Sequence, residues 1–313
     1  MIVTATVGKI DAAIGRFEAP ILAYMEKEEA DFAKDSLKKT LYNVKSSKHY
    51  AESIAGLTGV GDFVATDGPV PYDEFEEGYS KTFIHHVFKK GIEIKRELID
   101  DSRIIDMENH AGKLMDAANR TMEKFVHAPF NNAASTSFTL AGKTFANTGA
   151  DGKPLAAADH PSKTGKAPDQ SNKTTYELNL QNLKLAEEMM KDFVTDIGEK
   201  SNVKPDTLLV PFELRNEAWE LVQSVGKPDT ADNNVNPYHN KYRVIVSDWL
   251  TDDDAWFLID SRYMKKCLYW IDRVKLEISS KKDFNTDNWM IKGYMRYSLG
   301  WTDWRWVVCN IPA

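Results

Sequence analysis

The feature that most constrains this chain is one long amphipathic stretch between residues 98 and 127. Its apolar side chains recur every three or four residues, the spacing that places them on one side of an α-helix. They are Ile104, Met107, Ala111, Leu114, Ala118, Met122 and Phe125. The pattern predicts one helix of about seven turns, with Asp100 and Asp101 in its first turn and Pro129 at its end. Its length favours the interpretation that this helix is a spine on which other elements lie. A long core helix of any α/β protein would show the same pattern.

The segment before this helix has the signals of a long extended excursion. Glycine and proline are dense between Gly56 and Pro71, which predicts a loop. Tyr79–Phe88 and Gly91–Arg96 then alternate like two strands, and Lys89–Gly91 between them is typical of a hairpin turn. Excursions of this length are uncommon in a compact domain unless they act outside it.

Residues 1–56 predict an N-terminal arm that is mainly helical. Phe17, Ile21, Tyr24 and Met25 lie at helical spacing, and a charge-dense stretch follows them. Few other side chains here could start a core, so we favour an arm that completes its packing on a neighbouring molecule. The alternative is an ordinary amphipathic helix on its own domain.

The second half of the chain predicts a separate α/β unit of about 70 residues, because short strands and helices alternate from residue 205 onward. The expected elements are strands at 208–210, 242–246 and 255–259 and a helix at 212–225. Before it, residues 131–176 predict one or two strands with a long surface loop, and 179–198 predict a helix. After it, residues 274–278 and 289–310 return to strand-like alternation broken by Gly300. Trp289, Trp301, Trp304 and Trp306 predict that this end is buried in a core or an interface.

The polar clusters do not predict a metal centre. Asp252–Asp254 lacks the spaced ligands of a calcium loop and favours a solvated turn. His85 and His86 are neighbours on a predicted strand and point to opposite faces, so they do not readily share one metal ion. These histidines and His160 are interpreted as structural or surface residues.

No residue pattern predicts catalysis or a cofactor site. Cys267 and Cys309 lack a nucleophile signature, and free cysteines are usually inert core residues. Neither glycine-rich phosphate-binding motif occurs. A soluble α/β enzyme that uses one of the two cysteines with a histidine is the more distant alternative.

Charge and hydropathy exclude several classes of protein. The net charge of −7 and the pI of about 5.6 argue against a protein that coats itself in nucleic acid. No apolar run approaches the roughly 20 residues of a transmembrane helix, and the N-terminus does not resemble a signal peptide. With two cysteines and no predicted disulfide, we expect a protein made in a reducing cytoplasm, without a membrane partner.

The order of these elements resembles the major capsid proteins of tailed bacteriophages, which have the Hong Kong 97 fold, and within them the Mu-type major head subunits. Six stretches carry the resemblance, over roughly residues 55–313. They are Glu77–Lys81 with Gly91–Asp101, Asp151–Leu155 through Asp159–Pro161, Leu178–Leu180, Leu208–Pro211 with Leu214 and Ala218, Asn233–Pro237, and Gly300–Arg305.

The resemblance implies an α+β capsid fold with four parts. They are an N-terminal arm at 1–56, an extended loop at 57–92, a peripheral domain at 93–199 and 273–313 with its spine helix at about 98–127, and an axial domain at 200–272. The loop is expected to lie on a neighbouring subunit. No lysine–asparagine crosslink between subunits is predicted.

By the same resemblance, the chain assembles with copies of itself into pentamers and hexamers of an icosahedral head. A separate scaffolding protein and a portal are expected partners, and packaged double-stranded DNA is near without being bound sequence-specifically. The nearer alternative is an encapsulin-like compartment with an enzyme cargo. The candidate residues at interfaces between subunits are Phe17, Tyr24, Tyr79, Phe83, Phe88, Arg96, Trp301, Trp304 and Arg305.

Overall fold

The computed structural model describes residues 7–57, 62–63, 65–70, 72, 77–226 and 235–312. Its helices are α1 (Val7–Asp35), α2 (Lys38–Leu41), α3 (Arg96–Asp100), α4 (Ile104–Asn131), α5 (Leu180–Lys191), α6 (Arg215–Val222) and α7 (Ser261–Cys267). Its first strands are β1 (Asn43–Ser46), β2 (Ala51–Leu57), β3 (Glu77–Ile84), β4 (His86–Ile94), β5 (Ser137–Leu140), β6 (Lys143–Ala146) and β7 (Lys173–Thr174). The later strands are β8 (Thr207–Pro211), β9 (Arg243–Ser247), β10 (Trp256–Ile259), β11 (Leu268–Lys282), β12 (Trp289–Trp301) and β13 (Val307–Asn310).

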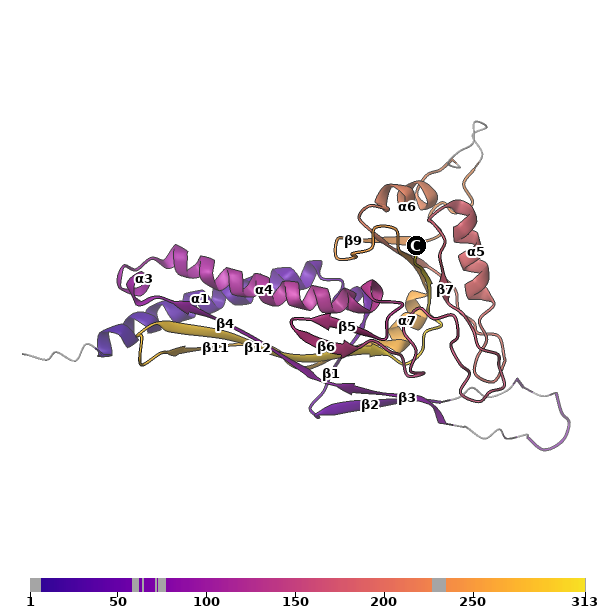
Figure 1. Ribbon diagram of the computed structural model, residues 1–313, viewed down its shortest axis with the longest axis horizontal. Coiled ribbons are helices and arrows are strands. Elements are labelled where there is room, and N and C mark those ends of the chain that lie inside the picture. The colour runs from indigo at the N-terminus through magenta and orange to yellow at the C-terminus, as the bar shows by residue number, and fades with distance from the viewer. Residues whose placement is uncertain are drawn as a thin grey trace, which may run out of the picture.

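Helix α4 is the predicted spine, and it runs along a sheet in the order β1-β11-β12-β4 (Figure 1). It begins six residues later than predicted, at Ile104, because Ser102 has a φ of +54° and separates it from α3. Pro129 was predicted to stop the helix but lies inside it, and the helix ends at Asn131. A proline this close to the end removes only one hydrogen bond, and the buried Phe130 holds the last turn.

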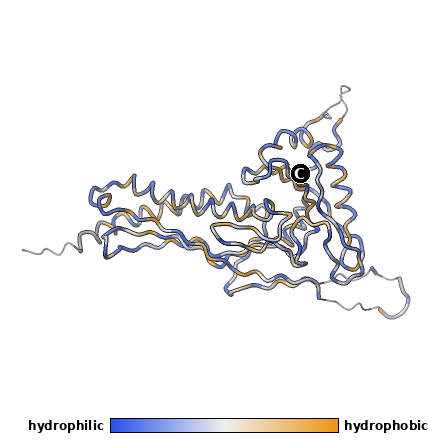
Figure 2. The backbone as a smooth tube through the Cα atoms, in the orientation of Figure 1, coloured by the Kyte–Doolittle hydropathy of each residue, from blue (hydrophilic) through white to orange (hydrophobic). Residues whose placement is uncertain are grey.

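Helix α1 packs along α4 in this chain (Figure 1). Phe17, Ile21 and Met25 are buried with Met107 and Leu114 of α4. Hydrophilic and hydrophobic residues alternate along both helices, as expected for two amphipathic helices that share one apolar seam (Figure 2). Within this chain the apolar side of α1 therefore packs on α4, which agrees with the alternative of an amphipathic helix on its own domain. Contact of the arm with a neighbouring copy stays a prediction.

The predicted hairpin between Tyr79–Phe88 and Gly91–Arg96 is wrong. β3 pairs with β2, while β4 pairs with β12, and Lys89–Gly91 lies inside β4. The arm also contains two strands, β1 and β2, where helix was expected. The pairing partners lie far apart in the sequence, so local turn signals could not identify them. Of the extended loop, residues 58–61, 64, 71 and 73–76 lie outside the described residues.

A second sheet, in the order β7-β13-β10-β8-β9, forms the core of the other unit with α5 and α6. The predicted strands and the helix at 212–225 are present, with the helix shorter, at Arg215–Val222. Three elements of this unit, β7, α5 and β13, lie outside the predicted bounds of 200–272, and Leu268–Asp272, inside those bounds, belongs to β11. The helix predicted at 179–198 ends at Lys191, and Asn233 and Asn234 lie outside the described residues.

The stability of this fold is expected to decrease in acid because His86 is neutral in it. Burial and then the nearby Lys143 ammonium lower the pKa of His86 from 6.5 to about 4. Between these two values the unfolded chain binds more protons, so the free energy of unfolding falls as the pH drops from 6.5 to about 4. A His86→Gln variant should show a smaller difference between urea midpoints at pH 7 and at pH 4.5. His85 and His127, whose pKa values burial also lowers, contribute the remaining background. An unchanged difference would contradict this assignment.

Candidate interaction surfaces

The two cysteines do not have the surroundings that the alternative hypothesis, an enzyme with a cysteine nucleophile, requires. Cys267 and Cys309 are both buried, and burial raises the pKa of each thiol. Within the described ranges there is no group of three or more histidine, cysteine or carboxylate side chains that could hold a metal ion. In the same ranges, none of the helices combines the length and apolar character that crossing a membrane requires.

His160 is buried, and it lies in a polar network that the sequence did not reveal. Its Nδ1 lies 2.6 Å from Asp151 Oδ2, and its Nε2 lies 3.1 Å from Asn172 Oδ1. The Asn172 amide nitrogen donates to the carbonyl oxygens of Leu155 and Val307, so Oδ1 must accept and Nε2 must donate. The ring also stacks on Trp304 with centroids 4.2 Å apart. This network turns the predicted surface loop into part of the core.

Arg305 links two segments of the chain, residues 194–196 and residues 303–305, from the inside of the molecule. Its Nη2 donates to Asp196 Oδ1 at 2.8 Å, and its Nη1 donates to Asp303 Oδ2 at 2.9 Å. Its Nε donates to the Val194 carbonyl oxygen at 2.8 Å. The side chain is buried, so this cation is fully committed to partners in its own chain.

The candidate interface residues fall into two groups. Phe17, Phe83, Phe88, Trp301, Trp304 and Arg305 are buried in this chain, which argues against direct side-chain contact with another molecule. Tyr24, Tyr79 and Arg96 remain partly exposed. Apart from Arg305, the buried group consists of aromatic residues, and aromatic content in a sequence does not distinguish a core from an interface. For the exposed group, contact with another copy stays a prediction.

Residues that sequence reasoning missed lie at three extremities of the molecule. Near the two-stranded ribbon β2–β3, Tyr50, Phe63 and Tyr72 are exposed, with Phe63 fully so. The second unit exposes Phe212 and Trp219 at α6. Phe284 is exposed at the turn between β11 and β12, and Met290 is exposed nearby in β12. Val70 is a further exposed residue of the first group, and Val225 and Val235 are further exposed residues of the second. Apolar side chains that gather in one patch mark surfaces that bind other molecules, whereas a single exposed one is common on any protein.

The ribbon is anchored to the body by Phe83. This side chain packs with Tyr269 and Ile271 of β11, its ring centroid 6.0 Å from that of Tyr269. A Cβ at Gly300 would lie 3.0 Å from the Phe83 ring, so the glycine expected to break the strand makes room for the anchor within β12. A two-stranded ribbon is marginally stable alone, so this anchor holds it as an extension of the sheet.

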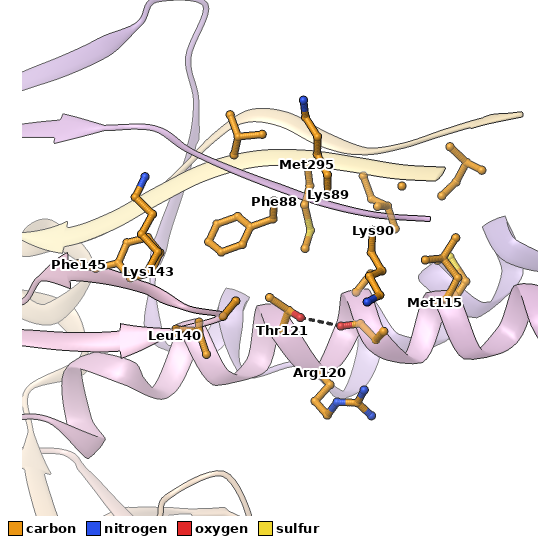
Figure 3. Close-up of a pocket in the computed structure, with 18 residues that line it drawn as sticks. Phe88, Lys89, Lys90, Met115, Arg120, Thr121, Leu140, Lys143, Phe145 and Met295 are labelled. Atoms are coloured by element: carbon orange, nitrogen blue, oxygen red, sulfur yellow. Dashed lines mark hydrogen bonds between the residues drawn. The ribbon is translucent and has the colours of Figure 1, made fainter. Parts of the chain in front are cut away.

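An apolar groove of about 440 Å³ lies between α4, β4, the β5–β6 hairpin and the β11–β12 pair (Figure 3). Its apolar walls are Val87, Phe88, Leu114, Met115, Ala117, Ala118, Leu140, Ala141, Phe145, Leu276, Ile278 and Met295. Lys89, Lys90, Arg120 and Lys143 also line it. In Figure 3 the Lys90 side chain reaches from β4 toward α4, whereas the Arg120 guanidinium points away from the strands. The geometry fits the docking of an apolar side chain better than chemistry on a substrate, because the lining holds no carboxylate, histidine or cysteine.

Comparisons with known proteins identify a family and a fold that this chain resembles. Residues 81–310 match the family model described as phage capsid protein. A solved structure from Mycobacterium phage Patience is 10% identical, with 96% of this chain and 88% of that chain covered and a TM-score of 0.56. One from Microbacterium phage Oxtober96 is 10% identical, with 89% and 91% covered and a TM-score of 0.55. A capsid of a native GTA particle is 12% identical, with 89% and 90% covered and a TM-score of 0.53. No curated protein sequence matches the chain.

Proposed function

We infer, because this chain belongs to the phage capsid protein family, that its copies join as pentamers and hexamers and close an icosahedral head around double-stranded DNA. The chain is a major capsid protein with the Hong Kong 97 type of fold, and its place is the virion. The narrower Mu-type assignment stays a prediction from the six sequence stretches.

The observation that best supports the assembly is the arrangement of exposed apolar side chains. A shell subunit must meet several copies of itself, and each contact can be weak because several act together. Exposed aromatic residues at the ribbon, at α6 and at the β11–β12 turn provide three separate contact regions. We propose that the ribbon and its loop lie on a neighbouring subunit, and that the unit with α5 and α6 is the axial domain. The remainder is then the peripheral domain, with α4 as its spine.

The proposed partners follow from this role and from charge. A separate scaffolding protein and a portal act during assembly, which takes place in the host cytoplasm. The net charge of −7 suits a protein that stands beside packaged DNA without gripping phosphates, since tight phosphate contacts would hinder its movement.

The purified full-length chain should form shell-sized particles, alone or with its scaffold, in negative-stain microscopy. A variant in which Asn-Gly replaces residues 58–76 should keep its circular dichroism spectrum and lose the particles. The described residues in this stretch (62–63, 65–70 and 72) belong to none of the hydrophobic clusters. Leu57 and Glu77 are paired across the ribbon, so a two-residue turn can join them. Wild-type chains that stay monomeric in every condition would contradict the proposal.

A further inference from the structure

Two arginines lie on neighbouring strands of the long sheet, near the base of the β2–β3 ribbon. Arg296 is in β12, and its Cα partner in β11 is Val274. Arg273 comes just before Val274, at a shift of the register between Asp272 and Val274. A β-bulge of this kind leaves one residue unpaired and re-aims its side chain. It therefore brings a second guanidinium close to the first, although like charges on neighbouring strands repel each other.

His85 adds a third nitrogen-bearing side chain to this place. It joins β3 of the ribbon to β4 of the sheet, and its Nδ1 lies 2.9 Å from the Ser298 hydroxyl oxygen. Ser298 and Arg296 are two residues apart in β12, so they share the face that carries the ribbon (Figure 1). Burial, then the charge of Arg296 and more weakly that of Arg273, lower the pKa of His85, so both arginines act on this ring. We call His85, Arg273 and Arg296 the ribbon-base cluster.

Each member of the ribbon-base cluster has a buried nitrogen atom without a hydrogen-bond partner among the described residues. These atoms are His85 Nε2, Arg273 Nε and Arg296 Nε. His85 as a whole is only 4% exposed. Folded proteins rarely leave buried polar groups unpaired, because an unpaired group loses its hydrogen bonds to water and gains none in return. Three such atoms in one cluster indicate a ligand that accepts hydrogen bonds.

The charges of the ribbon-base cluster point to an anion. Within the described part of the chain neither arginine forms a salt bridge, and the Arg296 guanidinium lies 5.6 Å from the ring centroid of Tyr50. Glu52 of β2 is the carboxylate whose charge acts on His85. Its Oε1 accepts a hydrogen bond from the Ser47 hydroxyl at 2.5 Å. Two guanidinium groups therefore stand against one carboxylate that is bonded elsewhere, and one anion would balance them.

The kind of anion follows from the donors and from their surroundings. A guanidinium binds an oxyanion through a planar fork of N–H groups, and these charge-assisted bonds are strong. Donors on β11, on β12 and at the joint between β3 and β4 match a tetrahedral ion, whose oxygens point in different directions. Since the three nitrogen atoms are covered, a free ion reaches them more easily than the backbone of a DNA duplex. Tyr50 is 71% exposed, so its ring can move away from Arg296 at little cost and admit the ion.

We propose that the ribbon-base cluster binds one phosphate-class oxyanion, with Arg273 and Arg296 each donating from a guanidinium fork and His85 donating from Nε2. In this arrangement the Ser298 hydroxyl donates to His85 Nδ1, which leaves the ring proton on Nε2. The anion ties the ribbon to β11 and β12 beside the apolar anchor Phe83. This inference goes beyond the proposed function and does not depend on assembly.

Titration calorimetry with inorganic phosphate tests the site in the full-length, unassembled chain, in chloride buffer of constant ionic strength. The wild type should bind one phosphate per chain. Arg273→Gln and Arg296→Gln should each lower the affinity roughly tenfold or more, because each removes one charge-assisted fork. Arg243→Gln makes the same change at an exposed arginine of β9 and should bind phosphate like the wild type. A wild type that binds no phosphate, or cluster variants that bind it unchanged, would overturn the site.

A competition experiment identifies the source of the anion. Short duplex DNA, added at the same concentration of phosphate groups, should leave the binding of inorganic phosphate unchanged. Displacement of the phosphate by the duplex would overturn the assignment to a free ion and would favour the backbone of packaged DNA.

A second measurement needs no variant of the two arginines and so does not depend on their folding. The imidazole signal of His85 is followed by NMR in the wild type and is assigned with His85→Gln. Phosphate should shift this signal and raise the measured pKa of His85, since a neighbouring anion favours the charged ring. The signal of His239, which is exposed in the second unit, should not respond. A His85 titration that phosphate leaves unchanged would contradict the site, whereas the shell function is judged separately by the formation of particles.

Discussion

Phe125→Ala is expected to lower the free energy of unfolding of the unassembled subunit by about 4 kcal/mol, which is the cost of truncating a buried phenylalanine. Phe125 is only 2% exposed and lies at the centre of the core beneath α4. Its ring centroid lies 5.2–5.9 Å from the rings of Phe88, Phe138, Phe145, Trp270 and Tyr297. The cavity would therefore open where the helix, both strands of the β5–β6 hairpin and the sheet meet, and no single neighbour could move to fill it.

The same substitution at Phe284 is the control for this prediction. Phe284 is 94% exposed at the turn between β11 and β12, so Phe284→Ala should change the unfolding free energy by less than about 0.5 kcal/mol. Urea titrations followed by tryptophan fluorescence give both values. A loss at Phe125 no larger than that at Phe284 would show that the aromatic cluster does not support the fold.

Phe125 also shows how far the sequence predicts this fold. Its place on the apolar side of the spine helix follows from the spacing of residues along α4, and the helix was predicted for the same reason. Its partners come from β4, β5, β6, β11 and β12, and no local pattern relates these strands. The strands of the second unit were predicted because runs such as Leu208–Val210 are apolar throughout. Their order in the sheet was not predicted, because it depends on contacts between distant residues.

The buried loop was missed because of its composition. Residues 147–172 are small and polar, which is typical of a surface segment, yet Asn147, His160 and Asn172 are buried. Their side chains provide hydrogen bonds that a solvated loop would receive from water. Asn147 Nδ2, for example, donates to the carbonyl oxygens of Asn132 and Ser135. Polar residues that satisfy buried backbone groups have no periodic signature.

For a related reason, the sequence does not show which of the candidate interface residues this chain buries. Trp301 and Trp304 were selected because they are aromatic, but this chain buries them itself. The groove depends on residues of α4, β4 and β6 that meet only after folding, so the sequence shows its cations as scattered pairs.

Arg305→Met is expected to destabilise the subunit by about 3–5 kcal/mol, because it leaves two carboxylates in a partly buried site without their cation. The side chains of Asp196 and Asp303 are only 18% and 19% exposed, and both now pair with the guanidinium. Arg305→Lys should recover little, since an ammonium group cannot reach both carboxylates and the Val194 carbonyl oxygen with one planar fork. A surface pair provides the control: Arg103 lies 2.6 Å from Asp106 but is 58% exposed, so Arg103→Met should cost less than about 1 kcal/mol.

A further variant distinguishes two causes of the stability lost in Arg305→Met, unpaired carboxylates and lost packing. If unpaired carboxylates cause it, adding Asp196→Asn and Asp303→Asn to Arg305→Met should restore part of the stability, because neutral amides are less costly to bury than charges. If lost packing causes it, the triple variant should be no more stable than the single one. Urea midpoints at pH 7 distinguish the two outcomes. The Arg305 site joins residues 194–196 to the segment that follows β12. It also includes Tyr263 of α7, whose hydroxyl donates to Asp303 Oδ2 at 2.8 Å. We therefore expect Arg305→Met also to lower the particle yield.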